Sequence, residues 1–183
     1  MLRSLSQKLF LSHFLAIMLV SGGMAGYFYW SAAKALRSNL DDQLRQTAAM
    51  LGQTIDARDL EEIVAPEDVS KASYQRYLTL LRDVQQANPS LSYIYLMRLT
   101  DAGPLFVIDS DESKDQCLPG DKYEDVNQAP ALMGGFFHQA VDPEIVIDRW
   151  GAFLSGYAPL RHGEGRYLVG VDMDVHEVSA HFR

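Results

Sequence analysis

Residues 148–175 read DRWGAFLSGYAPLRHGEGRYLVGVDMDV, and this stretch decides the fold. It predicts two strands, Gly151–Leu160 and Arg166–Val175, joined by a tight turn at residues 162–165 (HGEG). In the second strand, apolar residues that share one face alternate with residues of the other face, which include Gly170 and Asp172. This is the pattern of a strand with one buried face. A carboxylate beside a glycine leaves room for a small ligand on the other face.

The remaining segments predict helices followed by further strands. Apolar residues at three- and four-residue steps favour a long helix, and an Asn88-Pro89 pair ends a second one. In order, we expect a helix over 31–54, a connector with a short helix over 60–64, a helix over 70–86, strands over 92–99 and 105–109, a polar loop over 110–128, a helix over 130–140 and a strand over 144–147. This order predicts an α+β fold in which helices cover one side of an antiparallel sheet.

An apolar segment near the N-terminus is predicted to cross a membrane. Leu9–Trp30 contains no Asp, Glu, Lys or Arg, and about 20 apolar residues span a bilayer core. Arg3 and Lys8 favour a cytoplasmic N-terminus. A signal peptide cleaved near residues 31–33 is the alternative, but its apolar part is usually only about 7–15 residues long. The expected domains are a cytoplasmic N-terminus (1–8), a transmembrane helix (9–30) and an extracytoplasmic domain (31–183).

Composition and motifs argue against several functional classes. The net charge of −8 is unsuited to nucleic acid, and a single cysteine, Cys117, allows neither an intramolecular disulfide nor a multi-cysteine metal site. The acidic run 109–115 (DSDESKD) fails the EF-hand template, because Lys114 replaces the required glycine and Gly120 the bidentate glutamate. There is no HExxH, GxSxG or phosphate-binding glycine loop. We therefore expect no enzyme, no metal site and no cofactor.

Asp172 is the first candidate for a ligand contact. A carboxylate in the middle of an apolar strand needs a cation or hydrogen-bond donors, and either a ligand amine or Arg98 would fill that role. A purely structural Asp–Arg pair is the alternative. Arg98 points away from Tyr93 and Tyr95 on its own strand, so they cannot all line one pocket through that strand, and we expect Arg98 to bind a carboxylate or a phosphate.

Four further residues are candidates for the same site. Trp150 and Tyr157 would wall a pocket, since aromatic rings supply much of the surface of small-molecule sites, although aromatic residues on a sheet also serve as plain core. Ser155 shares the face of Tyr157 and offers a hydroxyl group. Asp109 ends a strand and is expected to face the pocket.

Six short motifs follow one another at characteristic intervals. They are residues 93–95 (YIY), 107–111 (VIDSD), 119–123 (PGDKY), 148–151 (DRWG), 154–159 (LSGYAP) and 169–172 (VGVD). Together with the anchor and the long helix, they resemble the extracytoplasmic Cache (PAS-like, PDC) sensor domains of bacterial signalling receptors. The resemblance covers most of residues 31–180. It implies about five strands behind a long N-terminal helix, and a small ligand on the opposite sheet face.

Such domains are the input modules of histidine kinases, diguanylate cyclases, phosphodiesterases and chemoreceptors. A second membrane helix and an output domain usually follow the sheet, whereas this sequence ends at Arg183; it is either a fragment or a sensor without its own output. We expect a single-pass protein of the bacterial inner membrane with its main domain in the periplasm or outside the cell. That domain would bind a small polar or anionic ligand and signal through its N-terminal helix, within a homodimer formed by that helix. The alternative is an anchored protein-interaction module without a small ligand.

Overall fold

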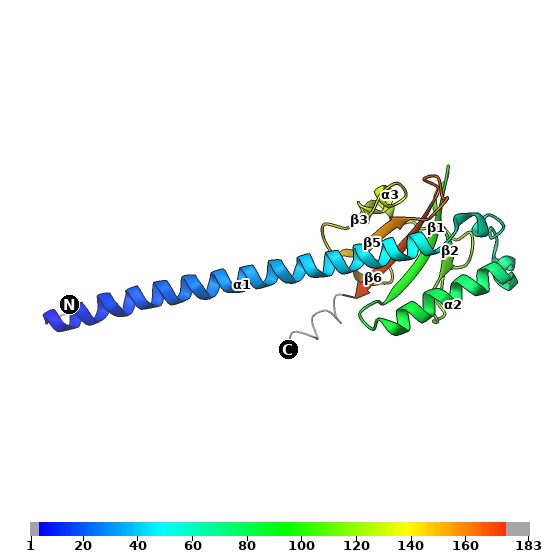
Figure 1. Cartoon of the computed structure of the whole chain (residues 1–183). Helices are drawn as coiled ribbons and strands as arrows, with labels where there is room; N and C mark the ends of the chain where they lie inside the picture. Colours follow the sequence, from blue (N-terminus) through cyan, green and yellow to red (C-terminus); the bar gives the residue numbers. More distant parts are fainter. Residues whose placement is uncertain (1–3, 175–183) are drawn as a thin grey trace. The chain divides into compact units, whose positions relative to one another are not determined.

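The computed structural model describes residues 4–174 and has an α+β architecture (Figure 1). Its helices are α1 (Leu5–Thr54), η1 (Ala57–Leu60), η2 (Pro66–Ser70), α2 (Ala72–Ala87), η3 (Val126–Gln128) and α3 (Leu132–Gly135), where η denotes a 3₁₀ helix. Its strands are β1 (Tyr93–Thr100), β2 (Gly103–Asp109), β3 (Ala140–Val141), β4 (Val146–Asp148), β5 (Gly151–Pro159) and β6 (Tyr167–Asp174). The antiparallel sheet has the order β2-β1-β6-β5-β3, and β4 pairs with β5. The predicted fold class is confirmed.

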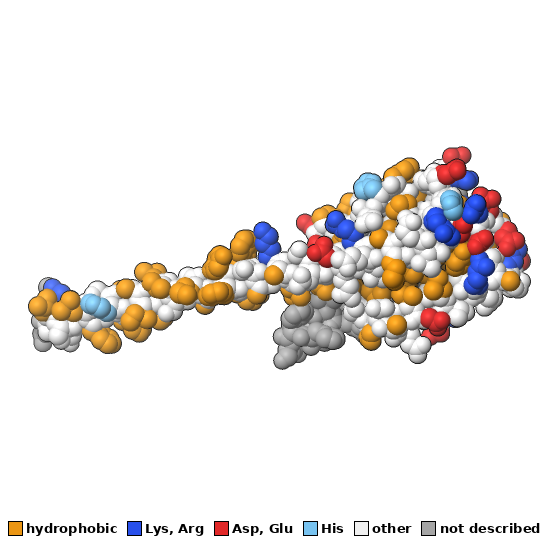
Figure 2. All heavy atoms as spheres, in the orientation of Figure 1, with side chains coloured by type: hydrophobic (Ala, Val, Ile, Leu, Met, Phe, Trp, Pro, Cys, Tyr) orange, Lys and Arg blue, Asp and Glu red, His pale blue; other side chains and the backbone are white. Residues whose placement is uncertain are grey.

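Helix α1 unites the predicted membrane segment and the predicted long helix without a break at Trp30. The chain divides into two compact units, one up to Leu40 and one from Asp41 onward. In the first unit α1 is long and apolar enough to cross a membrane, and the side chains of its apolar stretch are exposed within the described part of the chain. Figure 2 shows hydrophobic side chains along this stretch, whereas charged side chains gather over the second unit.

In the second unit, the last turns of α1 lie against β5 at very short range. A Cβ atom on Gly156 would lie 2.8 Å from the Cβ of Leu44, and one on Gly52 would lie 2.5 Å from the carbonyl oxygen of Pro159. The core beside these contacts is fully buried and contains Leu44, Ala48, Leu51 and Ile55. Helix α2 lies beside β1 and β2 and buries Tyr74, Tyr77, Leu78 and Leu81. The two helices thus cover one face of the sheet (Figure 1).

Replacing Gly52 with alanine is expected to destabilise the protein by about 1–3 kcal/mol, the usual cost of overpacking. The new methyl group would meet a backbone oxygen, which no side-chain rotation can move aside. Urea unfolding of the full chain in detergent, followed by circular dichroism, measures the change. Gln53→Ala, at the exposed neighbouring position of α1, is the matched control. If the two variants are equally stable, the short α1–β5 contact is not rigid.

The hairpin of β5 and β6 forms as predicted, with Val175 outside the described residues. The expectation that only one of its faces is buried is wrong, because every residue of β6 except Asp174 is buried. The second face is covered by a core in which the loop after β2, α3 and β4 pack against residues of β1, β2, β5 and β6. This core comprises Tyr95, Met97, Phe106, Cys117, Tyr123, Ala129, Leu132, Phe136, Val146, Tyr157 and Leu168. Helices therefore cover one face of the sheet, and the loop with α3 covers the other.

Two predicted helices differ from the observed structure. In place of a helix over 60–64 the connector contains η1, capped by Asp56, and η2, which begins at Pro66, because proline suits the first position of a helical turn. The helix expected over 130–140 shrinks to α3, since Gly134 and Gly135 weaken a helix. The chain then continues into β3, whose pairing with β5 competes with further helix.

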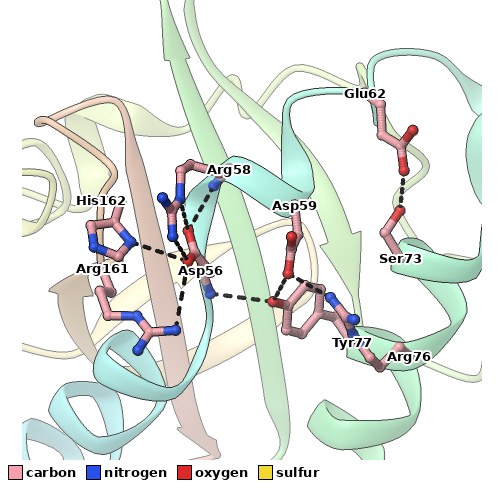
Figure 3. Close-up of polar contacts among 9 residues, drawn as sticks. All are labelled: Asp56, Arg58, Asp59, Glu62, Ser73, Arg76, Tyr77, Arg161 and His162. Carbon is pink, nitrogen blue, oxygen red and sulfur yellow. Dashed lines mark hydrogen bonds and ion pairs between the residues drawn. The ribbon is translucent and has the colours of Figure 1, made fainter.

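A polar cluster ties the end of α1 to the tip of the β5–β6 hairpin (Figure 3). The carboxylate of Asp56 accepts hydrogen bonds from Nε (3.0 Å) and Nη2 (2.6 Å) of Arg58, and these hold its pKa well below the usual range. From the hairpin, Nδ1 of His162 lies 3.1 Å and Nη2 of Arg161 lies 3.6 Å from Asp56 Oδ2. The hydroxyl of Tyr77 on α2 accepts from the Asp56 amide. The cluster joins three elements on the helix side of the sheet.

Candidate functional site

The register of the central strands arranges side chains in two rows across the sheet. In an antiparallel sheet, residues directly opposite one another share a face. One row is Tyr93–Asp172–Ser155, and the other is Asp109–Tyr95–Gly170–Tyr157. Gly156, the neighbour of Ser155, faces Leu44 of α1. Both rows therefore lie on the face away from α1.

A pocket opens over parts of both rows, at Tyr93, Asp172, Asp109 and Tyr95. Its cavity volume is about 30 Å³, and the empty space around it, which includes open solvent, is about 370 Å³. Four carboxylates and six aromatic rings line it, namely Asp109, Asp111, Asp148, Asp172, Tyr93, Tyr95, Phe106, Tyr123, Trp150 and Phe153. A second, more open hollow adjoins it through Tyr93, Asp111 and Trp150, and there Lys114 and Arg149 are part of the wall. The inner pocket is acidic and aromatic, while cationic side chains stand in the outer hollow.

Asp172 is part of the pocket wall and is 8% exposed. Its Oδ1 accepts a hydrogen bond from the Tyr95 hydroxyl at 3.2 Å, and Ser155 also donates to the carboxylate. Burial raises the pKa of Asp172 to about 8, against the lowering effect of these two hydroxyl groups. Within residues 4–174 no Lys, Arg or His forms an ion pair with it. Asp172 is thus a buried carboxylate supported by neutral donors.

Backbone amides fix two further carboxylates. Asp109 accepts from the amides of Cys117 (2.9 Å) and Asp111 (3.1 Å), and burial raises its pKa to about 6. Asp148 accepts from the Trp150 amide at 2.9 Å and from the Gly151 amide at 3.2 Å, and burial raises its pKa as well. These bonds hold the carboxylates in place but add no positive charge.

The aromatic residues form a connected wall. The rings of Tyr123 and Trp150 stack with centroids 6.0 Å apart and planes 13° apart, and Phe106 meets both edge-on. A Cβ atom on Gly170 would lie 2.1 Å from the ring of Tyr95. The sequence predicted space for a ligand beside Gly170, and this expectation is wrong, because the Tyr95 ring fills that space and brings its hydroxyl to Asp172.

The structure separates the six predicted site residues. Asp172, Asp109 and Trp150 line the pocket, and Ser155 supports Asp172 from beside it. Tyr157 lies deeper, outside the pocket wall, and its hydroxyl donates to buried Asp142 at 2.7 Å.

Arg98 lies on the other face of the sheet. Its guanidinium donates to the Tyr167 hydroxyl at 3.0 Å and to the carbonyl oxygens of Leu60 and Ile63 at 2.6 and 2.8 Å. There it joins β1 to the connector after α1, and it is not part of the pocket. The alternative role considered for it, a structural pair with Asp172, is also not observed, because the sheet lies between the two side chains.

Sequence reasoning did not identify seven pocket residues as ligand contacts: Tyr93, Tyr95, Phe106, Asp111, Tyr123, Asp148 and Phe153. For the two tyrosines of β1 a signal existed, since strand alternation puts them opposite Arg98 and hence on one face together. The pairing of β1 with β6 then adds Asp172 to that face. No local pattern brings Tyr123 and Trp150 together, because they come from separate loops.

No protein-family model and no curated protein matches the sequence. Solved structures match its fold. The sensor domain of Escherichia coli DcuS shares 16% identity with a TM-score of 0.56, over 81% of this chain and 98% of that one. The sensor domain of the Vibrio cholerae histidine kinase DctB shares 12% identity with a TM-score of 0.60, over 92% of this chain and 60% of that one. The predicted resemblance is confirmed for the fold: the chain has the architecture of PDC/Cache-type extracytoplasmic sensor domains.

Proposed function

We propose that this protein is a membrane-anchored extracytoplasmic sensor module that binds a small molecule in the pocket at Asp172. The observation that carries the proposal is the pocket itself, which holds a buried carboxylate without a cationic partner among residues 4–174. Keeping such a group is costly unless something else needs it. The fold shared with sensor domains of histidine kinases supports the functional class. We propose Asp172, Asp109 and Trp150 as ligand contacts, with Ser155 as a positioning residue.

The signal would leave the pocket through β5 and α1. Asp172 on β6 is paired with Ser155 on β5, and the next residue, Gly156, meets Leu44 of α1. A ligand that moves the Asp172–Ser155 row therefore acts one residue away from the helix contact. If the protein has two conformations that differ in the position of α1, a ligand can shift the balance between them only by as much as its affinities for the two conformations differ.

The membrane topology is also a proposal. The apolar first part of α1 would cross the bacterial inner membrane once, with residues 1–8 in the cytoplasm and the sheet domain in the periplasm or outside the cell. We also propose that two copies of α1 pair in a homodimer, so that a shift of the helices is transmitted to the cytoplasmic side of the membrane. The solved neighbours are named as sensor domains, and we propose a binding role for the pocket with no catalysis.

Thermal unfolding of the full chain in nanodiscs tests the proposal. The expected result is that one chemical class among amines, amino acids, carboxylates and divalent cations stabilises the protein, by about 2.7 kcal/mol at 100 times its dissociation constant. Trp150→Ala should weaken the effect, because the ring is part of the pocket wall. Met133→Ala removes an exposed side chain outside the pocket and should not. If no class stabilises a well-folded sample, the alternative of a protein-interaction module replaces the sensor.

A further inference from the structure

The charge of the pocket wall is one-sided. Its acidic side chains are four carboxyl groups, and within residues 4–174 no Lys, Arg or His is part of the lining. Cationic side chains close by lie outside this lining, with Lys114 and Arg149 in the outer hollow and Arg82 on α2. Arg149 lies over the Trp150 ring at 4.0 Å in the outer hollow, and Arg82 of α2 donates to the carbonyl oxygens of Ser110 and Asp111. An anionic ligand would find no cationic side chain in this lining to balance its charge, whereas an organic cation would pair with carboxyl groups whose charged form is costly to bury alone.

The hydrogen-bonding capacity of Asp172 points the same way. A carboxylate has about four acceptor positions, and from residues 4–174 Asp172 receives bonds from two hydroxyl groups, those of Tyr95 and Ser155. An ammonium group offers the missing donors and the missing positive charge together. Hydrogen bonds between charged partners are about twice as strong as neutral ones.

The rest of the wall suits an organic cation better than a metal ion. Aromatic faces attract ammonium groups, and the pocket has six rings, three of which (Phe106, Tyr123 and Trp150) contact one another. Among the described residues, no three His, Cys, Asp or Glu side chains are grouped closely enough to hold a metal ion. The four carboxylates are therefore spread around a cavity, and they do not converge on one point.

We propose that the ligand of this pocket is a small organic ammonium compound whose cationic group binds Asp172 among the aromatic rings. This inference rests on the proposed function, since it names the ligand class of the same site. It replaces the polar or anionic ligand that the sequence favoured. The reason is the structure's own arrangement: Arg98, the residue that made an anion plausible, lies on the other face of the sheet.

Tryptophan fluorescence gives a direct test. The chain has two tryptophans, so in a Trp30→Phe background Trp150, in the pocket wall, is the sole reporter. The full chain in nanodiscs would be titrated with butylamine and phenethylamine, and with the alcohol and the carboxylate of each carbon skeleton. Calcium chloride and succinate complete the set. Concentrations up to about 10 mM detect dissociation constants in the millimolar range.

We expect the ammonium compounds to change Trp150 emission and to bind at least about 10-fold more tightly than their alcohols, with no binding of the carboxylates. Tighter binding of an alcohol, a carboxylate or calcium would overturn the organic-cation assignment and leave the proposed binding pocket standing. If nothing binds, both proposals fail.

Asp172→Asn isolates the charge, because asparagine keeps the shape of the side chain. It should weaken ammonium binding by about 10- to 100-fold and leave alcohol binding within about 3-fold, since a bond to a charged group is replaced by a neutral one. Asp101→Asn, at the exposed β1–β2 turn, removes one charge from the same domain and is the matched control. Circular dichroism verifies that both variants are folded. Unchanged ammonium affinity in a folded Asp172→Asn protein would overturn the proposal.

Discussion

Gly170→Ala is expected to lower the free energy of unfolding by about 1–3 kcal/mol, the range for overpacked cores, and to abolish ligand binding. The added Cβ would lie 2.1 Å from the ring of Tyr95, and 2.7 Å from its hydroxyl oxygen. Tyr95 is 8% exposed and packs edge-on against Phe106, so its ring can move only toward the pocket that it lines. The ring must leave its place, and the hydrogen bond to Asp172 is lost with it.

Urea unfolding of the full chain and the Trp150 titration measure the two effects separately. Gly134→Ala is the matched control, because its Cβ would meet only the exposed His138 ring, at 3.2 Å. That variant should keep the stability and the ligand affinity of the parent. A stable Gly170→Ala protein with normal ligand binding would show that Tyr95 does not position Asp172.

Without ligand, the protein is expected to become less stable as the pH rises from about 5 to about 8, by about 2 kcal/mol or more. The folded-state pKa of Asp172, about 8, lies above the unfolded value, 3.8. In this window the folded state therefore binds more protons than the unfolded state, and raising the pH favours unfolding. The contribution is fully present below the unfolded pKa and is lost as the pH approaches 8.

The other carboxyl groups with shifted pKa values do not reverse this dependence of stability on pH. Asp109 and Asp148 also have raised pKa values, so they add to the same trend. The pKa values of Asp56 and Asp68 are lowered, and their contribution is lost only in acid, below this range. Urea midpoints of the full chain across the pH series measure the slope, and Asp172→Asn should flatten it. A parent protein whose stability is constant or rises from pH 5 to 8 contradicts the burial of a protonated Asp172.

The strand positions in the two hairpins were predictable to within one or two residues. In the β5–β6 hairpin the signal is the alternation of residues in β6, and in the β1–β2 hairpin it is the turn that separates two apolar segments. The connector after α1 was not predictable in the same way. There the local capping by Asp56 and the fixed φ of Pro66 outweigh a weak apolar pattern.

The candidate site was predictable only in part, for a similar reason. Asp172 and Asp109 stand out as carboxylates within apolar strands, and both line the pocket. The cover over the second face depends on contacts between distant segments, such as Tyr123 with Trp150. The role of Gly170 depends on the side chain of a neighbouring strand, Tyr95, which fills the space that the glycine leaves. The sequence identifies Gly170 as a position without a side chain, but it does not show that the Tyr95 ring fills the space beside it.

The close contact of α1 with β5 has a consequence for how affinity should be measured. At Gly52 and Gly156 no side chain separates the helix from the strand, so no rotamer change can absorb a relative movement. Coupling between two parts of a protein is reciprocal. If a ligand moves the helix through β5, then fixing the helix in a bilayer changes how readily the pocket accepts the ligand. The membrane would then act as an effector of the site, and a fragment without its anchor would bind the same ligand with a different dissociation constant.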